Sequence, residues 1–320
     1  MTEPLFTDDE DYERPRMAAH GPVRVRVPAK VNLHLQVGPP RRDGFHELTT
    51  VYHAISLYDE ITARRGDTLA VTMEGEGAGS LPLDEDNLVF KAARLLAKHT
   101  GHDPHARLHL RKQIPVAGGL AGGSADAAAT LVACDQLWGT GLGRDDLAEI
   151  AAALGSDVPF LVLGGTALGT GRGERVSPVL ASTHSWQWVL AIADGGLSTP
   201  AVYRELDRLR EINRAPDPAS RGPEALLAAL RQRDPVVLAD TFANDLQPAA
   251  LSLRPELADT IEAGMDAGAL AGLVSGSGPT CFFLAEDARH AAIVAEELGA
   301  REVCREVRVA HGPVAGARAH

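Results

Sequence analysis

The sequence has few cysteines and no long apolar run. Its three cysteines, Cys134, Cys281 and Cys304, lie far apart, and none belongs to a CxxC pair. This spacing argues against a disulfide framework and against a zinc site, and it fits a reducing cytoplasm. No apolar stretch reaches the length of about 18 residues that a transmembrane helix needs, so we expect no membrane span.

Basic residues are also in the minority. Lysine and arginine together number 31 and aspartate and glutamate 43, which gives a formal net charge of −12. This balance argues against nonspecific binding to nucleic acid or to anionic membranes. It does not exclude an anionic small substrate, because a local pocket can be positive on an acidic protein.

The remaining composition is that of an ordinary globular protein. With 320 residues, of which 45% are hydrophobic and 23% charged, the chain is expected to form two soluble domains. The first 16 residues, MTEPLFTDDEDYERPR, carry six acidic residues and no apolar core, so they are neither a secretion signal nor a transit peptide. We expect residues 1–20 to be a disordered acidic tail.

The clearest strand pattern stands near the start of the chain. Apolar and polar residues alternate from Val23 to Val37, which predicts a strand with one buried and one polar face. Pro28 cannot donate to a strand ladder and therefore marks an edge, a bulge or a break. Lys30 and Asn32 share the polar face. Further strands are expected near 49–65, 67–75 and 107–114, and helices over 87–99, 125–138 and 145–154.

The second half of the chain has a different order of expected strands and helices. Strands are expected at 185–194, 270–276, 280–286 and 303–310, and helices over 200–213, 223–232, 253–267 and 286–298. Without the extra helices the order is β-α-β-β-α-β, as in ferredoxin-like folds. A Gly-rich segment sets the domain boundary near residue 172, so we expect an N-terminal domain over 21–172 and a C-terminal domain over 173–320.

Residues 115–125, PVAGGLAGGSA, are mostly glycine and alanine and stand just before an expected helix. Glycines there let backbone N–H groups turn toward an anion, and the helix adds the positive end of its dipole. Ser124 stands at the expected N-cap, and its hydroxyl could instead reach a phosphate or a metal. Asp126 would repel a phosphate, so it should point away. The other interpretation is a tight loop that only packs a helix against a strand, and neither GxxxxGK[ST] nor GxGxxG fits the segment.

Three segments, in order, resemble the motifs of the GHMP kinases, the family of galactokinase, homoserine kinase and mevalonate kinase. PVAGGLAGGSADAA is similar to the phosphate-binding loop of that family, PAKVNLHLQV to its N-terminal motif and LVSGSGPTCFFL to its C-terminal Gly-rich motif. The resemblance implies an α+β fold, in which an N-terminal domain of the ribosomal S5 domain 2-like type precedes a C-terminal ferredoxin-like domain. It also implies ATP and Mg²⁺ as cofactors.

Within the family, AKVNLHLQVGPPRRDGFHEL and LGSDVPFLVLGGTALGTGRGE match the motifs of one member much more closely. That match implies a small-molecule kinase of isoprenoid biosynthesis. Its substrate would be a cytidine-diphosphate-linked polyol, of which one alcohol group is phosphorylated.

The resemblance implies that Asp157 is the catalytic carboxylate and that Lys30 is its partner. A carboxylate accepts or orients the hydroxyl proton, and a lysine beside it offsets charge on the transferring phosphoryl group. Asn32 would bind the substrate or hold Asp157. Spacing alone favours Asp157 as the N-cap of a short helix and Lys30 as a solvated surface charge, and the resemblance reverses both. His34 continues the face of Lys30, and we expect it to be exposed.

The resemblance also implies a pocket for the cytosine base. Phe45 would stack on the ring, since stacking needs only a π face, and His46 would hydrogen-bond the base edge. The family more often has tyrosine in place of Phe45, so any contact from its hydroxyl is absent. Tyr203 would close the other side, and Gly171 and Arg172 would line the substrate diphosphate or the interdomain cleft. The simpler interpretation is a loop Phe45 that covers the core beside an exposed His46.

The implied ATP contacts fall on the glycine-rich loop and on the start of helix 87–99. Asn87 and Leu88 would border the adenine, although Asn87 fits equally well as a helix N-cap. Residues 275–278 would pack under the loop, and by themselves they predict a hairpin turn. Ser124 would touch the metal. The loop residues implied to bind ATP are Pro115, Val116, Ala117, Gly118, Gly119, Leu120, Ala121, Gly122, Gly123, Ser124 and Ala125.

Three other functions stay open. Another small-molecule kinase or a decarboxylase of the same family would leave Phe45 and His46 without an evident use. A catalytically silent relative that binds nucleotide as a regulator is disfavoured by Lys30, Asp157 and the intact glycine loop together. An S5-like RNA-binding module is disfavoured by the net charge and by the lack of a basic stripe. We therefore expect a cytoplasmic monomer or homodimer with no nucleic-acid partner and no membrane partner.

Overall fold

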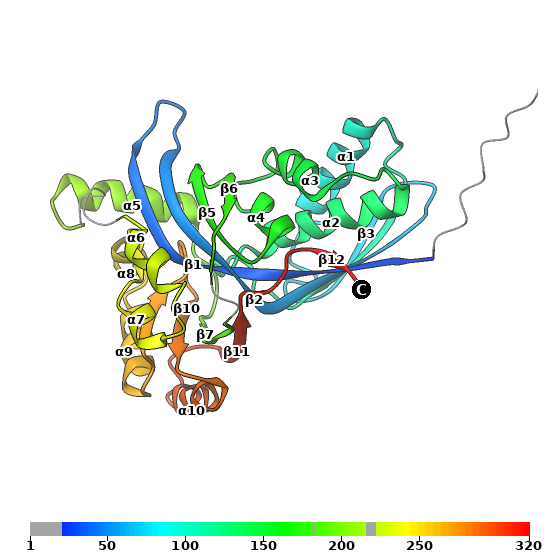
Figure 1. Cartoon of the computed structure of the whole chain (residues 1–320). Helices are drawn as coiled ribbons and strands as arrows, with labels where there is room; N and C mark the ends of the chain where they lie inside the picture. Colours follow the sequence, from blue (N-terminus) through cyan, green and yellow to red (C-terminus); the bar gives the residue numbers. More distant parts are fainter. Residues whose placement is uncertain (1–20, 182–183, 216–221) are drawn as a thin grey trace, which may run out of the picture.

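The computed structural model describes residues 21–181, 184–215 and 222–320, so the expected acidic tail lies outside the described residues. These residues build two β-sheets, with helices packed against both (Figure 1). None of the helices in this part of the chain has the length and apolar character that a membrane crossing requires.

The larger sheet is organised around one long antiparallel hairpin. Its strands, β1 (Val23–Pro40) and β2 (His46–Arg64), run across the molecule in Figure 1. The order along the sheet is β12-β1-β2-β4-β3, with β5 paired to β2, β6 paired to β5, and β8 parallel to β1. The other strands are β3 (Ala70–Gly75), β4 (Arg107–Lys112), β5 (Thr166–Gly171), β6 (Arg175–Pro178), β8 (Ala243–Asn244) and β12 (Arg318–Ala319).

β1 keeps the expected polar face but buries it. The pairing register shifts between Pro28 and Ala29, so the proline sits at a β-bulge, one of the three expected outcomes. From Val27 to Leu35 both faces are buried. The glycine-rich loop and the loop at Gly276 lie against the polar face, which removes it from water. The expectation that His34 faces solvent is wrong, because its side chain is 2% exposed.

Four helices lie together on the larger sheet, above the β1–β2 hairpin in Figure 1. α2 (Gly122–Trp138) packs between β1, β2 and the neighbouring helices α1 and α4. It is buried on all sides, which explains why its sequence is so rich in alanine. The other three are α1 (Leu88–Thr100), α3 (Arg144–Ala151) and α4 (Val158–Leu163).

The smaller sheet has the order β11-β7-β10-β9, with every neighbouring pair antiparallel. This is the strand order of a ferredoxin-like fold, which confirms the predicted α+β architecture. The helix expected over 253–267 is α9 (Glu256–Asp266), which begins after Pro255, and α8 (Gln247–Leu253) before it was not expected. The remaining elements are β7 (Trp186–Ile192), β9 (Ala271–Val274), β10 (Cys281–Ala285), β11 (Glu306–Gly312) and α10 (Ala288–Gly299).

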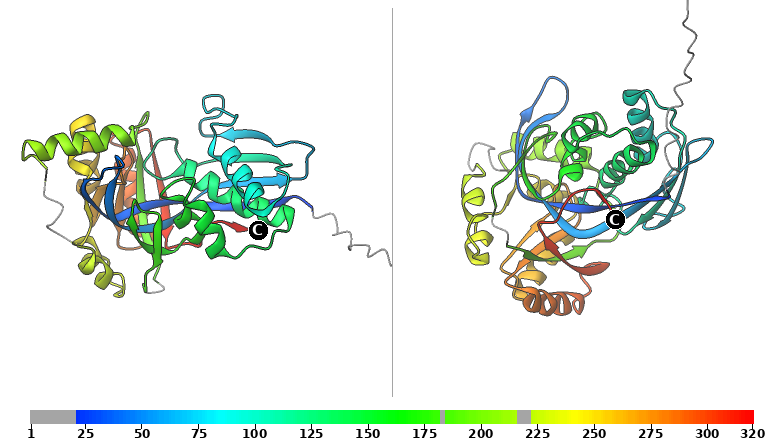
Figure 2. Two further views of the ribbon diagram at one scale, coloured as in Figure 1. Left: turned by 90° about the horizontal axis from the view of Figure 1, so that it is seen from above. Right: turned by 45° about the vertical axis from the view of Figure 1, so that its right-hand side comes forward.

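Helix α5 (Thr199–Glu211) connects the two halves. It lies against the outer part of the β1–β2 hairpin (Figure 2), where Val202, Leu206 and Leu209 pack on Leu35 and Val37. Two short helices, α6 (Glu224–Ala229) and α7 (Pro235–Ala239), follow it. α5 therefore holds the outer end of the hairpin, which carries several predicted site residues.

The chain passes from the larger to the smaller sheet after β6. Residue 172, where we placed the domain boundary, lies in the turn between β5 and β6, and both of these strands belong to the larger sheet. At its end the chain returns, because β12 pairs with β1 beside the C terminus marked in Figure 1. The two halves are thus joined at more than one point.

Candidate active site

A cavity of about 840 Å³ is lined by residues of both halves of the chain. Its wall comes from β1, the β1–β2 turn, the glycine-rich loop, the segment before α4, the β5–β6 turn, α5 and residues 276–278. The cavity therefore collects segments that are far apart in the sequence. The predicted site residues outside the loop that line it are Lys30, Asn32, Phe45, His46, Leu88, Asp157, Arg172 and Tyr203.

The glycine-rich loop has an alternating backbone. Ala117, Gly119 and Ala121 have positive φ angles of 52°, 76° and 59°, whereas the residues between them do not. Such alternation turns successive N–H groups to one side and forms an anion-binding nest. Two of the three residues are alanines, which adopt this conformation at a cost of about 1–2 kcal/mol each. Backbone strain of this kind is typical of functional sites.

The loop runs directly into α2, which begins at Gly122. Ala121 occupies the N-cap and supplies no capping side chain, so the predicted N-cap at Ser124 is wrong. The left-handed backbone at Ala121 starts the helix earlier than the side-chain pattern suggests. Ser124 instead lies in the first turn and lines the cavity. A helix whose first N–H groups have no capping side chain is suited to bind an anion.

Gly119 is where the loop meets the C-terminal Gly-rich motif. A Cβ on Gly119 would lie 2.2 Å from the carbonyl oxygen of Ser275, so only glycine fits. The Ser275 hydroxyl donates a hydrogen bond to the Gly119 carbonyl at 3.0 Å, and the Thr280 N–H donates to the Gly118 carbonyl at 3.2 Å. The expected packing of residues 275–278 under the loop is confirmed. The same residues also form the turn between β9 and β10, so both interpretations hold.

Lys30 is buried beside Asp157. Its Nζ lies 3.7 Å from Asp157 Oδ2, and it donates hydrogen bonds to Asn32 Oδ1 at 2.7 Å and to the Gly119 carbonyl at 3.0 Å. Three acceptors thus surround the three donors of the ammonium group. Burial lowers the pKa of Lys30 from its ordinary value, and Asp157 partly offsets this shift. Lys30 is therefore no solvated surface charge.

Asp157 stands at the N-cap position of α4, but its side chain makes no capping hydrogen bond. The carboxylate is 29% exposed and lines the cavity. The prediction from spacing was thus right about the position of Asp157 and wrong about its capping role. Its carboxylate faces Lys30 and the cavity instead.

Tyr52, on β2, is a site residue that the sequence analysis missed. It lines the cavity, and burial, followed by the Asp157 carboxylate, raises the pKa of its hydroxyl well above the ordinary value. Its hydroxyl therefore keeps its proton beside Asp157. A Cβ on Gly173 would lie 2.3 Å from that hydroxyl, so the Gly-rich β5–β6 turn leaves room for it. Within a long apolar strand, no sequence signal distinguished Tyr52 from a core residue.

Asn32 ties Lys30 to the larger sheet. Its Nδ2 donates to Thr50 Oγ1 at 2.8 Å, and the Thr50 hydroxyl donates to the His34 carbonyl at 2.8 Å. Because its amide oxygen accepts from Lys30, both ends of the amide group are engaged. Asn32 holds Lys30 in this structure, whereas we expected it to hold Asp157 or the substrate.

Phe45, His46 and Tyr203 meet at the outer end of the cavity. Phe45 is 50% exposed, and the guanidinium of Arg172 lies 4.9 Å from its ring centre. His46 is 7% exposed, and its ring centre lies 5.0 Å from that of Tyr203. The simpler interpretation is therefore wrong on both residues, because the histidine is buried and the phenylalanine is open to the cavity.

The β1–β2 turn presents Phe45. Asp43 Oδ1 accepts a hydrogen bond from the Phe45 N–H at 3.1 Å, and Gly44 has a φ of 82°, which favours glycine. Asp207 contributes from the other side, since its Oδ1 lies 3.0 Å from His46 Nε2. Asp207 was not predicted, although Asp207 follows Tyr203 by four residues on the same helix and so shares its face.

A buried charged cluster lies beneath the glycine-rich loop. Lys112 Nζ donates to Asp59 Oδ2 at 2.7 Å and to Asp126 Oδ2 at 2.8 Å. Asp59 Oδ1 also accepts the N–H groups of Gln113 and Ile114, at 2.6 and 2.8 Å. Asp126 therefore points into the protein, as expected, and away from the cavity. Burial raises the pKa of Asp126 well above its ordinary value, although Lys112 opposes the shift.

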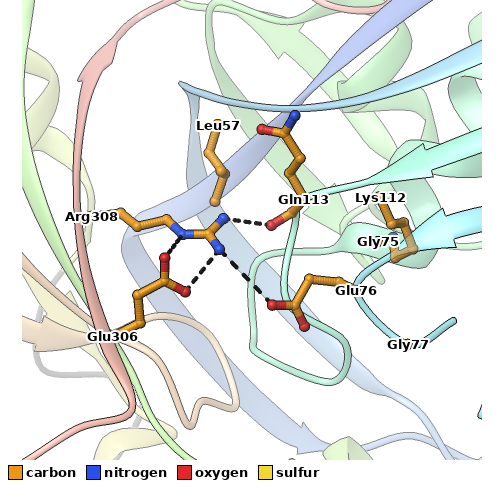
Figure 3. A pocket seen from close by; sticks show the side chains of 8 residues that line it. All are labelled: Leu57, Gly75, Glu76, Gly77, Lys112, Gln113, Glu306 and Arg308. Atoms are coloured by element: carbon orange, nitrogen blue, oxygen red, sulfur yellow. Dashed lines mark hydrogen bonds and ion pairs between the residues drawn. The ribbon is translucent and has the colours of Figure 1, made fainter.

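A second hollow, of about 750 Å³, lies between β11 and the end of β4 (Figure 3). Arg308 crosses it and donates to both Glu306 oxygens, at 2.6 and 2.8 Å, and to the Gln113 carbonyl at 2.7 Å. Its guanidinium also lies 3.9 Å from Glu76. Since carboxylates already surround Arg308, we interpret this hollow as an ionic contact between the two halves of the chain.

Some predicted ATP contacts do not reach the cavity. Asn87 accepts the N–H of Val89 at 2.9 Å and thus acts as the N-cap of α1, whereas its neighbour Leu88 lines the cavity. Leu120 and Ala125 are fully buried. Pro115 and Val116 also lie outside the lining, as does Gly171, which was predicted to contact the substrate.

The described residues hold no ready-made metal centre. In 21–181, 184–215 and 222–320, no group of three or more His, Cys, Asp or Glu side chains could hold a metal ion. Ser124 and Asp157 are nevertheless oxygen donors that line the cavity. Magnesium is usually bound by one or two protein oxygens together with phosphate and water, so these residues suit a metal that arrives with a nucleotide.

Two family models match the chain. They describe the GHMP kinases N terminal domain, over residues 87–165, and the GHMP kinases C terminal, over residues 226–303. The chain is 70% identical over 318 residues to 4-diphosphocytidyl-2-C-methyl-D-erythritol kinase of Salinispora tropica, with 99% of each chain covered. It is 58% identical to the protein of the same name from Mycolicibacterium gilvum, covering 93% of this chain and 92% of that relative.

Solved structures agree. A crystal structure of 4-(cytidine 5′-diphospho)-2C-methyl-D-erythritol kinase matches with a TM-score of 0.72 and 33% identity, over 90% of this chain and 98% of that one. Homoserine kinase of Cytophaga hutchinsonii matches with the same TM-score, 0.72, at 20% identity, over 99% of this chain and 100% of that one. The second likeness concerns the fold alone.

Proposed function

Because the chain belongs to the GHMP kinase family and, within it, to the 4-diphosphocytidyl-2-C-methyl-D-erythritol kinases, we propose that it phosphorylates 4-diphosphocytidyl-2-C-methyl-D-erythritol. The γ-phosphoryl group of ATP is transferred to the 2-hydroxyl, which gives the 2-phosphate and ADP. The reaction belongs to the non-mevalonate route to isopentenyl diphosphate.

The glycine-rich loop is suited to hold the triphosphate. Its nest at residues 117–121 and the N-terminus of α2 together offer several backbone N–H groups to an anion. The loop itself is held from below, because Asp59 binds the N–H groups of Gln113 and Ile114. A loop that is already in place loses little entropy when the nucleotide binds.

Ser124 is the residue that we expect to contact Mg²⁺. It lies in the first turn of α2 and lines the cavity beside the loop. When bound, the metal neutralises charge on the phosphate oxygens during transfer. Few protein ligands are needed for this, since the nucleotide supplies the other oxygens.

We expect Asp157 and Lys30 to carry out the chemical step. The Asp157 carboxylate accepts or orients the proton of the substrate 2-hydroxyl, whose oxygen forms a new bond to the γ-phosphorus. As that bond forms, the bond from the γ-phosphorus to the bridging oxygen breaks, and ADP leaves. The Lys30 ammonium, 3.7 Å from Asp157, offsets negative charge on the transferring group. Tyr52 keeps its proton beside Asp157 and can donate to the carboxylate.

The outer end of the cavity is suited to a cytosine base. Phe45 is half exposed, and Tyr203 and His46 line the same cavity in contact with each other. Arg172, over Phe45, brings a positive charge to where the substrate diphosphate would follow the base. The observation that carries the proposal is the shared cavity, in which one wall joins the Lys30–Asp157 pair, the glycine-rich loop and this aromatic end.

The test is ADP release by the purified protein with ATP, Mg²⁺ and 4-diphosphocytidyl-2-C-methyl-D-erythritol, beside homoserine, mevalonate and galactose. We expect turnover with the cytidyl substrate alone. Turnover with another alcohol would keep the family and overturn the substrate. ATP binding without turnover of any alcohol would instead indicate a silent regulator. Light scattering of the same sample tests our expectation of a monomer or homodimer.

A further inference from the structure

The contact between His46 and Asp207 carries an inference about base selectivity, which rests on the proposed function. His46 Nε2 lies 3.0 Å from Asp207 Oδ1, and the two side chains are 7% and 32% exposed. An ionised carboxylate only accepts hydrogen bonds, so Nε2 is the donor. We propose that Asp207 is a specificity-determining positioning residue, which holds a hydrogen on Nε2 and leaves Nδ1 of His46 to recognise cytosine.

The other ring nitrogen is available to a ligand. Among the described residues, Nδ1 of His46 has no hydrogen-bond partner, and His46 and Asp207 both line the cavity. The ring is also fixed in place, because Tyr203 packs against it at 5.0 Å. Because the ring is fixed and Nε2 is bonded to Asp207, Nδ1 points in a single direction.

Nδ1 matches cytosine when the ring is neutral. A neutral ring with its hydrogen on Nε2 offers Nδ1 as an acceptor, which suits the exocyclic amino group of cytosine. Uracil carries a carbonyl oxygen at that position, so two acceptors would face each other and neither would be paired. A buried polar group that is left unpaired is costly, so uracil is rejected.

Without Asp207 this discrimination weakens. The hydrogen of a neutral imidazole is then free to move to Nδ1, where it becomes a donor that suits the uracil carbonyl. Neither ring nitrogen would then be fixed as a donor or as an acceptor, and the ring could hydrogen-bond either base. The selectivity therefore depends on the carboxylate and not on the imidazole alone.

Asp207 is not needed to attach α5. Arg210 on the same helix donates to the Val37 carbonyl at 2.8 Å and pairs with Asp245 at 3.2 Å. Apolar residues of α5 also pack on β1. We therefore expect Asp207→Ala to fold with α5 in place, which a thermal melt would verify.

The experiment compares wild type with Asp207→Ala, Asp207→Asn and the control Glu205→Gln. Glu205 is a carboxylate on the same helix that accepts from Arg208 and Ser252 and does not line the cavity. Each protein is assayed with the cytidyl substrate and with its uridine counterpart, and calorimetry measures binding of cytidine and uridine 5′-diphosphate.

In Asp207→Ala we expect KM for the cytidyl substrate to rise about 10-fold, with kcat and KM for ATP nearly unchanged. The preference for cytidine over uridine should fall by a similar factor. Asp207→Asn keeps an acceptor and should recover part of the preference, and Glu205→Gln should resemble wild type.

An unchanged cytidine-to-uridine ratio in Asp207→Ala would overturn the inference, even if both KM values rise. That result would make Asp207 a tether of the helix and nothing more. If wild type turns over no cytidyl substrate, the proposed function fails separately. The diphosphate binding ratios of wild type and Asp207→Ala would still decide the role of Asp207.

Discussion

Lys30 and Lys112 are two buried lysines that both touch the glycine-rich segment, yet their surroundings differ. Lys30 has one carboxylate nearby, Asp157, at 3.7 Å. Lys112 has two, at 2.7 and 2.8 Å. Burial lowers the pKa of Lys30, and one distant carboxylate only partly offsets that shift. Burial also acts against the charge of Lys112, but Asp126 and Asp59 reverse the effect, so its pKa is raised.

The difference separates a reactive site from a structural one. Lys112 is 1% exposed, and its charge is balanced by two carboxylates at hydrogen-bond distance, so it is not presented to a ligand. Lys30 faces a cavity, and burial disfavours its positive charge. A phosphate that binds in the cavity would stabilise that charge. The number and distance of carboxylates thus assign catalysis to one lysine and support of the loop to the other.

The largest expected effect tests the reactive side of the comparison. Asp157→Asn removes the group that takes the hydroxyl proton and should lower kcat by about 10²- to 10⁴-fold. The phosphate loop does not depend on this carboxylate, so the Kd for ATP should stay close to that of wild type. Steady-state kinetics and calorimetric titration with ATP measure the two quantities. A comparable loss of ATP affinity would contradict the assigned role.

Lys112→Met tests the structural side. It leaves Asp59 and Asp126 buried without their cation, and removal of one partner from a buried ion pair typically costs about 3–5 kcal/mol. The free energy of unfolding, measured in urea, should fall by that amount. If the free energy fell by less than about 1 kcal/mol, the cluster would not support the loop as we describe.

Lys30→Met is the matched change at the other lysine. It should abolish most turnover, as Asp157→Asn does, but it should change stability little at pH 7. A lysine with a lowered pKa destabilises the folded protein at pH values below that pKa, and the penalty disappears as pH approaches the ordinary value near 10.5. Loss of the hydrogen bonds to Asn32 and Gly119 opposes the gain from removing this penalty, so the variant should stay within about 1 kcal/mol of wild type at pH 7 and become less stable relative to it above pH 10. Urea unfolding at both pH values would decide, and a clear loss of stability at pH 7 would refute the comparison.

Some features of the site could be predicted from the sequence, and others could not. Lys30, Asp157 and the glycine-rich loop were predicted because each lies in a contiguous motif that resembles those of the GHMP kinases. The burial of His34 was not, since segments far along the chain lie against β1 there, among them β8, which pairs with β1 at His34. The start of α2 was missed because it depends on the φ angle of Ala121, which side chains do not reveal.

Contacts between distant segments were the main omission. Asp207 meets His46 across 161 positions of sequence, and Lys112 meets Asp59 across 53. Lys112 looked like one of several basic residues on an alternating strand, and nothing local distinguished it from its neighbours. The structure therefore adds to the motifs mainly the ion pairs between segments that are distant in sequence.

The smallest expected effect concerns Asp126, and it follows from its raised pKa. A carboxyl group whose pKa is raised by folding contributes most to stability at low pH, and this contribution is lost as pH rises through the raised value. Asp126→Asn mimics the protonated form and keeps an oxygen that accepts from Lys112. The variant should thus be up to about 1 kcal/mol more stable than wild type at pH 8, with the difference shrinking toward pH 4. Urea unfolding at the two pH values measures this. A loss of stability at pH 8 would mean that Lys112 needs both negative charges, and the comparison of the two lysines would then rest on full ionisation of the cluster.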